Sequence, residues 1–305
     1  LFTYLSIGAI NCISVIFYIV YNDAIGNANR IFFYVNIYKS KEIKMRKLLS
    51  IIFLGILTLV LVSCKKENVD PLKDNVLTVG MECDYPPFNW LTSTPTDNSV
   101  KISGTNAYCD GYDVKFAKII AKELGVELEI KALDFDSLIE SLRVNDIDVI
   151  IAGMSPTERR KQTINFSDIY YISEQVNVVS KTGKYQDGKS INDFEGAKIS
   201  AQLGTLQVDL ISQLKGVIKA TPLETYPSLV NALNSNDIDG FIAEEPVAIQ
   251  IVNNNPNLTY IKLTEENFDV DESLISTAIG IRKENTDLLK KINNILSTIT
   301  LTQRE

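Results

Sequence analysis

The sequence predicts a mixed α/β protein built of two similar lobes, and two observations carry that prediction. Short β-branched runs alternate with segments in which apolar residues recur every three or four positions, as in layers of strands and helices. In addition, SLIESLRVNDIDVIIAG at 137–153 matches SLVNALNSNDIDGFIAE at 228–244 without a gap, with nine of 17 residues identical. A helix–turn–strand unit that returns after 91 residues indicates two lobes rather than a solenoid, whose period is about 20–50 residues.

The expected strands are short and rich in β-branched residues; they cover 77–80, 127–131, 148–152, 198–201, 240–243 and 277–281. A first helix is expected over 112–124, because apolar residues recur on one face and Gly125 supplies a stop. Two more apolar stripes have helical spacing: Phe135, Leu138, Ile139 and Leu142 in one, and Leu288, Ile292, Ile295 and Ile299 in the last. We interpret all of these stripes as core packing.

The repeat also predicts where a ligand would bind. Ligands of open α/β sheets bind beyond the carboxyl ends of the strands. Gly153 and Glu244 hold matching positions at the ends of the repeated segments, so we expect them on opposite walls of one cleft. Residues 154–160 and 245–246 would then lie at its mouth.

The amino-terminal segment differs from the rest in charge and hydropathy. Residues 1–63 carry six basic and two acidic side chains, a sum of +4, so the other 242 residues carry −12 and the chain −8. From Met45 the chain reads MRK, followed by a largely apolar run over 48–62 that is short for a membrane span but suits a signal peptide. The run ends in LVSC at 61–64, which resembles the bacterial lipobox and implies a lipid on Cys64. An uncleaved anchor followed by an ordinary buried cysteine is the alternative.

We therefore expect a signal peptide over 45–63 and a lipidated tether over 64–75. Translation is expected to start at Met45, the first methionine, which makes 1–44 a non-native upstream extension. An additional membrane segment within 1–21 is the alternative. Because the chain stops inside a helix-compatible sequence, we also expect its carboxyl end to be truncated.

Composition excludes several classes of function. A net charge of −8 makes the chain a poor partner for nucleic acid. The absence of histidine removes imidazole acid–base chemistry and the usual triads and zinc sites. Cys83 and Cys109 lie in the exported body, where a disulfide is possible, but two cysteines without metal-ligand spacing are more often unpaired. We expect them to be free thiols.

Four segments of the chain form a recognisable series: LTVGMECDYPPFNW (77–90), GYDVKFAKIIAKELG (111–125), DVIIAGMSPTERRKQTINFSDIYY (148–171) and AQLGTLQ (201–207). In the sequence and order of these segments the chain resembles the type-II periplasmic solute-binding proteins of amino-acid ABC transporters, bacterial extracellular solute-binding protein family 3. This resemblance implies an α/β fold of two lobes, each a mixed sheet flanked by helices, with the ligand in the inter-lobe cleft. The first lobe would comprise 76–173 plus 276–305 and the second 174–275, with crossings near 171–174 and 274–278.

The resemblance further implies a monomeric, lipid-anchored protein of the cell membrane that faces the periplasm or the cell exterior. It would bind a free amino acid without cofactor or metal and deliver it to the membrane permease of an ABC transporter. A dehydratase of the cyclohexadienyl or arogenate type shares this fold and is the enzyme alternative.

The resemblance assigns the amino-acid backbone to residues of both lobes. Arg160, the arginine of the TxxR pattern, would bind the α-carboxylate, because a guanidinium pairs with it in bidentate fashion. Further contacts to the carboxylate would come from Ser155, the amide of Met154, Thr205 and the amide of Leu206. Glu244 and the Gly153 carbonyl would accept the α-ammonium, with the adjacent Glu245 as the alternative acid.

The ligand side chain would meet a second set of residues. Tyr85 and Phe88 match the aromatic positions over the ligand, and Trp90 would close the rim. Glu82 would face the ligand side chain, with Gln202 and Gln207 adding polar contacts. An acid beside a tyrosine suits a cation, so we expect a polar or basic amino acid.

Overall fold

A computed structural model of the chain describes residues 71–300. The predicted upstream extension, the signal peptide, Cys64 and most of the tether lie outside these residues. Within 71–300, no helix is both long and apolar enough to cross a membrane.

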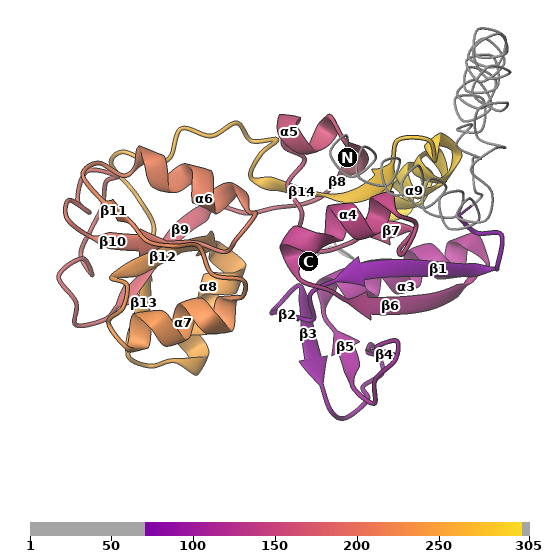
Figure 1. Cartoon of the computed structure of the whole chain (residues 1–305), viewed down its shortest axis with the longest axis horizontal. Helices are drawn as coiled ribbons and strands as arrows, with labels where there is room; N and C mark the ends of the chain where they lie inside the picture. Colours follow the sequence, from indigo (N-terminus) through magenta and orange to yellow (C-terminus); the bar gives the residue numbers. More distant parts are fainter. Residues whose placement is uncertain (1–70, 301–305) are drawn as a thin grey trace, which may run out of the picture. The chain divides into compact units, whose positions relative to one another are not determined.

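Two five-stranded sheets of the same plan form the centres of the two lobes (Figure 1). The first has the order β6 (Glu127–Ala132), β1 (Val76–Met81), β7 (Val149–Ile150), β14 (Ser276–Arg282) and β8 (Ile164–Ile172). The second has the order β11 (Ile218–Lys219), β10 (Lys198–Ser200), β12 (Gly240–Glu244), β9 (Gln175–Ser180) and β13 (Leu258–Ile261). In each sheet the fourth strand is antiparallel to both neighbours, and the first three pair in parallel.

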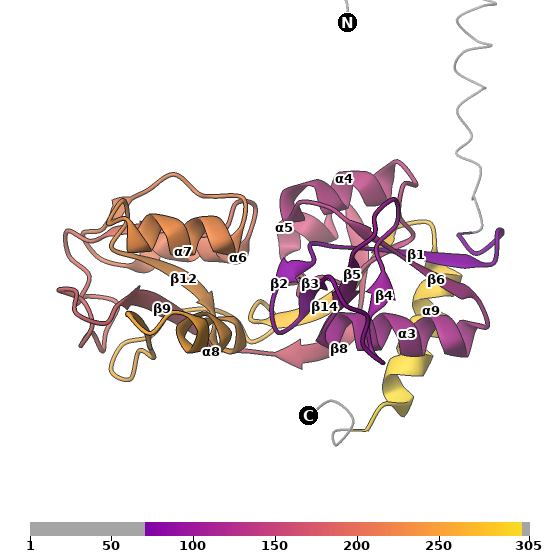
Figure 2. The ribbon, with the colours of Figure 1, turned by 90° about the horizontal axis from the view of Figure 1, so that it is seen from below.

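Helices cover both faces of each sheet. In the first lobe α4 (Leu138–Arg143), which continues the 3-10 turn η2 (Phe135–Ser137), lies on one face (Figure 2). The other face carries α3 (Tyr112–Leu124) and α9 (Thr286–Thr298). In the second lobe α7 (Tyr226–Asn234) and α8 (Glu245–Asn254) pack on one apolar cluster, and α6 (Leu206–Leu210), followed by η3 (Ile211–Gln213), packs on another.

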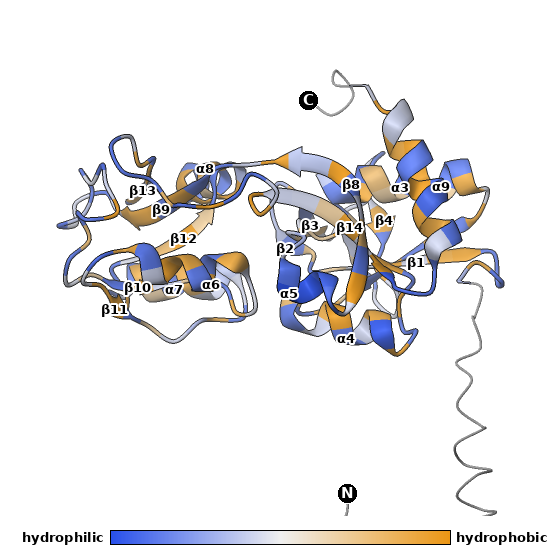
Figure 3. Cartoon of the chain, turned by 90° about the horizontal axis from the view of Figure 1, so that it is seen from above, coloured by the Kyte–Doolittle hydropathy of each residue, from blue (hydrophilic) through white to orange (hydrophobic). Residues whose placement is uncertain are grey.

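The predicted elements are present, with small differences at their ends. Helix α3 has the predicted bounds and stops at Gly125, whose φ of 73° is left-handed. In α9 the apolar stripe faces inward (Figure 3), and Ile299 is buried one residue beyond the helix end. The strand expected over 148–152 is shorter, since only Val149–Ile150 stay in the ladder before the chain turns toward Gly153.

The repeated NDID sequence forms the same turn in both lobes. Asn145 and Asn236 both have a left-handed backbone, with φ of 62° and 59°. Three residues later, Asp148 accepts a hydrogen bond from Thr78 N at 3.0 Å, and Asp239 accepts one from Lys198 N at 2.8 Å. Each aspartate thereby fixes its strand to the start of the neighbouring parallel strand, which explains why the sequence of the turn recurs.

The chain passes between the two sheets twice, once after Ile172 at the end of β8 and once before Ser276 at the start of β14. The two passages lie side by side, because Ser173 N donates to the Ile275 carbonyl at 3.1 Å.

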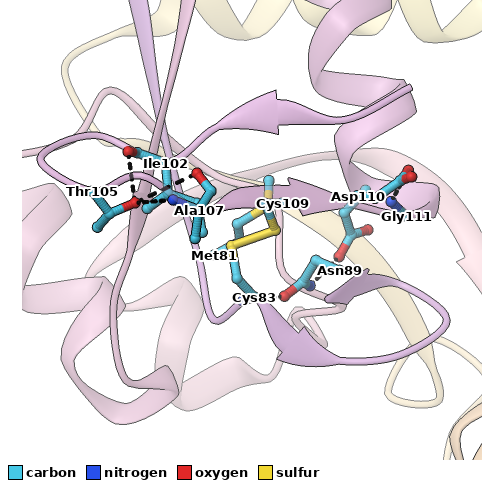
Figure 4. The surroundings of a disulfide bond; sticks show 10 residues. Met81, Cys83, Asn89, Ile102, Thr105, Ala107, Cys109, Asp110 and Gly111 are labelled. Atoms are coloured by element: carbon cyan, nitrogen blue, oxygen red, sulfur yellow. Dashed lines mark hydrogen bonds between the residues drawn. A yellow bond between two sulfur atoms is a disulfide. The ribbon is translucent and has the colours of Figure 1, made fainter. Parts of the chain in front are cut away.

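A small third sheet carries a disulfide that corrects our expectation of free thiols. It has the order β2 (Asp84–Tyr85), β3 (Asn89–Thr92), β5 (Tyr108–Asp110) and β4 (Val100–Lys101). Cys83 and Cys109 are bonded, with Cα atoms 5.6 Å apart, and both side chains are buried (Figure 4). Spacing along the chain could not reveal this pairing; the antiparallel pairing of β3 with β5 brings Cys109 to the end of β1.

Candidate functional site

One pocket is lined by residues of both lobes, at the carboxyl ends of the central strands. It gathers nine of the predicted ligand residues: Glu82, Tyr85, Gly153, Ser155, Arg160, Gln202, Thr205, Leu206 and Glu244. Gln207, predicted as an additional polar contact, also lines it. Within residues 71–300, no cluster of acidic, cysteine or histidine side chains is suited to a metal ion.

Three predicted residues lie outside this pocket, namely Phe88, Met154 and the expected rim residue Trp90, and two residues that line it were missed. Phe88 is buried and stacks on Tyr85 with ring centroids 5.1 Å apart, so it supports the pocket wall from behind. Met154 is buried beside a neighbouring cavity. The missed residues are Phe135 and Ala152. Phe135 was interpreted as core packing because it shares helical spacing with Leu138, but it lies just beyond a strand end, which is the signal that could have identified it.

Arg160 reaches the pocket from α5 (Glu158–Lys161), whose first turn is capped by the Thr157 hydroxyl. Its guanidinium donates to the Ser155 carbonyl at 2.7 Å and, across the cleft, to the Gly204 carbonyl at 2.9 Å. The guanidinium carbon lies 5.1 Å above the centre of the Phe135 ring. Burial, and secondarily Arg159, lowers the pKa of Arg160 to about 10, so the side chain remains cationic at neutral pH.

Glu244 ends β12 and is held by two donors. Its carboxylate accepts from Gln207 Nε2 at 2.6 Å and from the Tyr226 hydroxyl at 2.9 Å. Glu245 instead forms an ion pair with Lys262 at 2.9 Å, outside the pocket. The acid on this wall of the pocket is therefore Glu244, and the alternative at the next position does not line it.

Glu82 follows β1 and faces Gln202 of the second lobe, whose side-chain amide donates to the carboxylate. Burial raises the pKa of Glu82 well above its ordinary value, and the negative charges of Asp84 and Glu244 raise it further. Gln202 opposes this shift, as would any cation that approached the carboxylate.

Tyr85 forms the aromatic part of the pocket wall and is packed between rings of both lobes. Its ring stacks on Phe88 and on Tyr226, the latter with centroids 5.4 Å apart. Gly153 lies directly against this ring: its φ is +59°, and a Cβ there would be 2.7 Å from Tyr85 Cε1. The position therefore requires glycine.

Thr205 and Leu206 bring the start of α6 to the pocket. Thr205 precedes the helix, and its hydroxyl donates to the Gln202 carbonyl at 2.7 Å. Leu206 is the first helical residue, so its amide lies at the end of the helix that faces the pocket. The pocket thus combines a buried guanidinium, a buried carboxylate and backbone donors, which together can hold a zwitterion.

Comparison with known proteins identifies the fold and the family. The profile described as bacterial extracellular solute-binding proteins, family 3, matches residues 77–304. The chain belongs to this family. The resemblance predicted from the sequence is therefore confirmed.

Similar proteins of this family are named for amino acids. The arginine-binding extracellular protein ArtP of Bacillus subtilis is 29% identical over 83% of this chain and 92% of its own length. The L-cystine-binding protein TcyJ of Escherichia coli is 28% identical over 72% of this chain and 76% of its own length. Both names describe proteins that bind a solute.

A solved structure confirms the two-lobed α/β fold class. The substrate-binding protein AbpA of an amino-acid ABC transporter from Streptococcus pneumoniae, bound to L-arginine, superposes with a TM-score of 0.64 at 28% identity. The match covers 76% of this chain and 91% of AbpA.

Proposed function

We propose that this protein binds an extracytoplasmic amino acid with a polar or basic side chain and delivers it to the permease of an ABC transporter. The observation that carries the proposal is that Arg160 and Glu244, of opposite charge, line one pocket from opposite lobes. An α-amino acid has the complementary pair of charges on a single carbon atom. It would therefore contact both lobes at once.

In this proposal each half of the zwitterion has its own wall. Arg160 binds the α-carboxylate through the N–H groups of its fork. Ser155 adds a hydroxyl contact, and Thr205 adds another once its hydroxyl turns from the Gln202 carbonyl to the ligand. The amides of Met154 and Leu206 add backbone donors. Glu244 and the Gly153 carbonyl accept the α-ammonium.

The side chain of the ligand would lie between Glu82, Gln202 and the Tyr85 ring, all of which line the pocket. A cation there would offset the charge repulsion that Glu82 experiences and could contact the aromatic face. The names of ArtP and of arginine-bound AbpA agree with a basic ligand, and that of TcyJ with a polar one. We therefore propose the polar and basic class rather than a single amino acid.

Capture would proceed by hinge motion between a first lobe of 76–173 plus 276–305 and a second lobe of 174–275. A ligand that touches both lobes binds the closed arrangement more tightly than the open one and shifts the population toward it. The closed complex would then dock on the permease.

The test is calorimetric titration of the full-length chain with each of the twenty amino acids. We expect binding of at least one polar or basic amino acid, and a loss of about 100-fold or more in affinity for Arg160→Ala. Arg143→Ala is the matched control, because Arg143 lies on α4 in an exposed pair with Glu140 and should not change affinity. Absence of binding by the folded wild type overturns the proposal. Turnover of prephenate or arogenate would point to the dehydratase alternative.

We also propose that the protein is monomeric and is anchored through a lipid on Cys64, facing the periplasm or the cell exterior. The support is the lipobox-like LVSC sequence after an apolar run. Mass spectrometry of the membrane-extracted protein tests this: the expected amino-terminal residue is Cys64 carrying acyl chains. Detection of peptides from residues 1–40, or release of Cys64→Ala and wild type to equal extents, contradicts it.

A further inference from the structure

A buried carboxylate that takes no part in the pocket lies at the centre of a hydrogen-bond network in the first lobe. Asp113, in the first turn of α3, has no exposed surface. Its two oxygens accept hydrogen bonds from Asn89 Nδ2 and from the Tyr170 hydroxyl, both at 2.8 Å. Among residues 71–300 it makes no ion pair.

Each of these two donors continues to a backbone amide beside the pocket. Asn89 Oδ1 accepts from Cys83 N at 2.7 Å, and Cys83 directly follows Glu82 (Figure 4). The Tyr170 hydroxyl accepts from Gly153 N at 3.2 Å. One carboxylate is thereby joined, through one side chain on each side, to the two loops that present Glu82 and Gly153.

An aspartate at position 113 is informative, because burying a carboxylate costs free energy. A carboxylate buried without a cation is unfavourable, and here burial raises the pKa of Asp113 to about 6, although Tyr170, Asn89 and the backbone N–H of Gly153 oppose the shift. An apolar residue would pack in α3 without this cost. The carboxylate offers a separate acceptor oxygen to each of Asn89 and Tyr170, and those two side chains use their remaining atoms for Cys83 N and Gly153 N.

We propose that Asp113 is a positioning residue for ligand binding, which holds the Glu82 loop and the Gly153 loop at the separation that the ligand requires. The inference rests on the proposed function, since it concerns the same pocket. It assigns a role to Asp113, Asn89 and Tyr170, none of which lines that pocket.

Two substitutions interrupt the network at different points. Asp113→Asn keeps the shape of the side chain, but its amide N–H group would lie opposite Asn89 Nδ2 or the Tyr170 hydroxyl, which are themselves donors. Tyr170→Phe removes the hydroxyl between Asp113 and Gly153 N and keeps the ring, whose centroid lies 5.1 Å from that of Phe116. Ile292→Ala in α9 is the control, because it opens a cavity in the core of the same lobe and removes no hydrogen bond of the network.

The experiment uses the full-length chain and measures the calorimetric Kd for L-arginine first and then for the other nineteen amino acids. Each variant is titrated at a temperature where circular dichroism shows it folded, and NMR records the amide resonances of Cys83 and Gly153. We expect Asp113→Asn and Tyr170→Phe to raise the Kd about tenfold. Asp113→Asn should shift both amide resonances and Tyr170→Phe mainly that of Gly153. Ile292→Ala should lower the melting temperature but leave the Kd within about twofold.

The outcomes separate this inference from the proposed function. If the wild type binds and both network variants bind equally well, or if Ile292→Ala weakens binding as much as they do, the positioning role is overturned and the proposed function stands. If the folded wild type binds no amino acid, the proposed function fails and the inference fails with it.

Discussion

Removing the disulfide should destabilise the protein by an amount that follows from the length of the loop it closes. Cys83 and Cys109 are 26 positions apart in the sequence. A cross-link over that span removes chain entropy from the unfolded state worth about 3.5 kcal/mol at 25 °C. The perturbation is the double variant Cys83→Ala/Cys109→Ala, in which alanine avoids placing hydroxyl groups at two buried positions.

The single tryptophan provides a local probe for this measurement. Trp90 lies in β3 opposite Asp110 of β5, the residue after Cys109, so its fluorescence reports on the strands that the disulfide joins. With a urea m-value of about 2–3 kcal/mol/M, the unfolding midpoint of the double variant should fall by about 1–2 M. Reductant should shift the wild type by the same amount and leave the double variant unchanged.

Two results would refute this reasoning. One is an equal midpoint for the wild type and the double variant without reductant. The other is a thiol titration of the unfolded, unreduced chains in which the wild type shows two thiols more than the double variant. The comparison does not depend on the state of Cys12 or Cys64, because both proteins contain them.

Three further predictions concern single positions. Gly153→Ala should weaken ligand binding and lower the free energy of unfolding by about 2 kcal/mol or more, as measured by calorimetry. Gly104 also has a positive φ, but a Cβ there would meet no atom within 4 Å. Gly104→Ala should therefore show only the backbone cost of about 1 kcal/mol. Asp148→Asn should lower the free energy of unfolding in urea by about 3 kcal/mol, because it leaves buried Arg282 without the carboxylate that lies 3.0 Å away. Asp239→Asn, at the equivalent position of the second repeat, should lower it by less than about 1 kcal/mol. Equal losses for the two variants would contradict the argument. Burial raises the pKa of Asp84 and of Asp113 to about 6, so the folded protein holds protons that the unfolded chain releases near pH 4. Stability should therefore fall as pH rises from about 4 to about 6, and Asp113→Asn should flatten this dependence.

The sequence predicted two similar lobes because each copy of the repeat forms the same helix–turn–strand unit. Once the NDID turns are aligned, Gly153 and Glu244 fall at equivalent strand ends, and the pocket contains both. Arg160 was predicted from the register of a family pattern, and its position in a capped single-turn helix explains why that register matters. These features are local in sequence or repeated in it.

Other features depend on contacts between distant segments, which one sequence does not reveal. The Cys83–Cys109 bond depends on the pairing of β3 with β5. Phe88 was expected over the ligand because it matches an aromatic position of the family, yet it stacks on Tyr85 and only the Tyr85 side chain lines the pocket. The Asp113 network joins residues from three segments and has no signature at the level of spacing.

The hydrogen bond from Arg160 to the Gly204 carbonyl has a consequence for ligand selectivity. A ligand carboxylate competes with the Gly204 carbonyl for this N–H of Arg160. The binding free energy therefore gains only the difference between a hydrogen bond to a charged acceptor and one to a neutral acceptor. An amide or ester of the same amino acid offers another neutral acceptor and gains almost nothing by the exchange. The cross-cleft bond thus lowers the gain of every ligand that displaces it, and only a ligand with a free carboxylate keeps a net gain at Arg160.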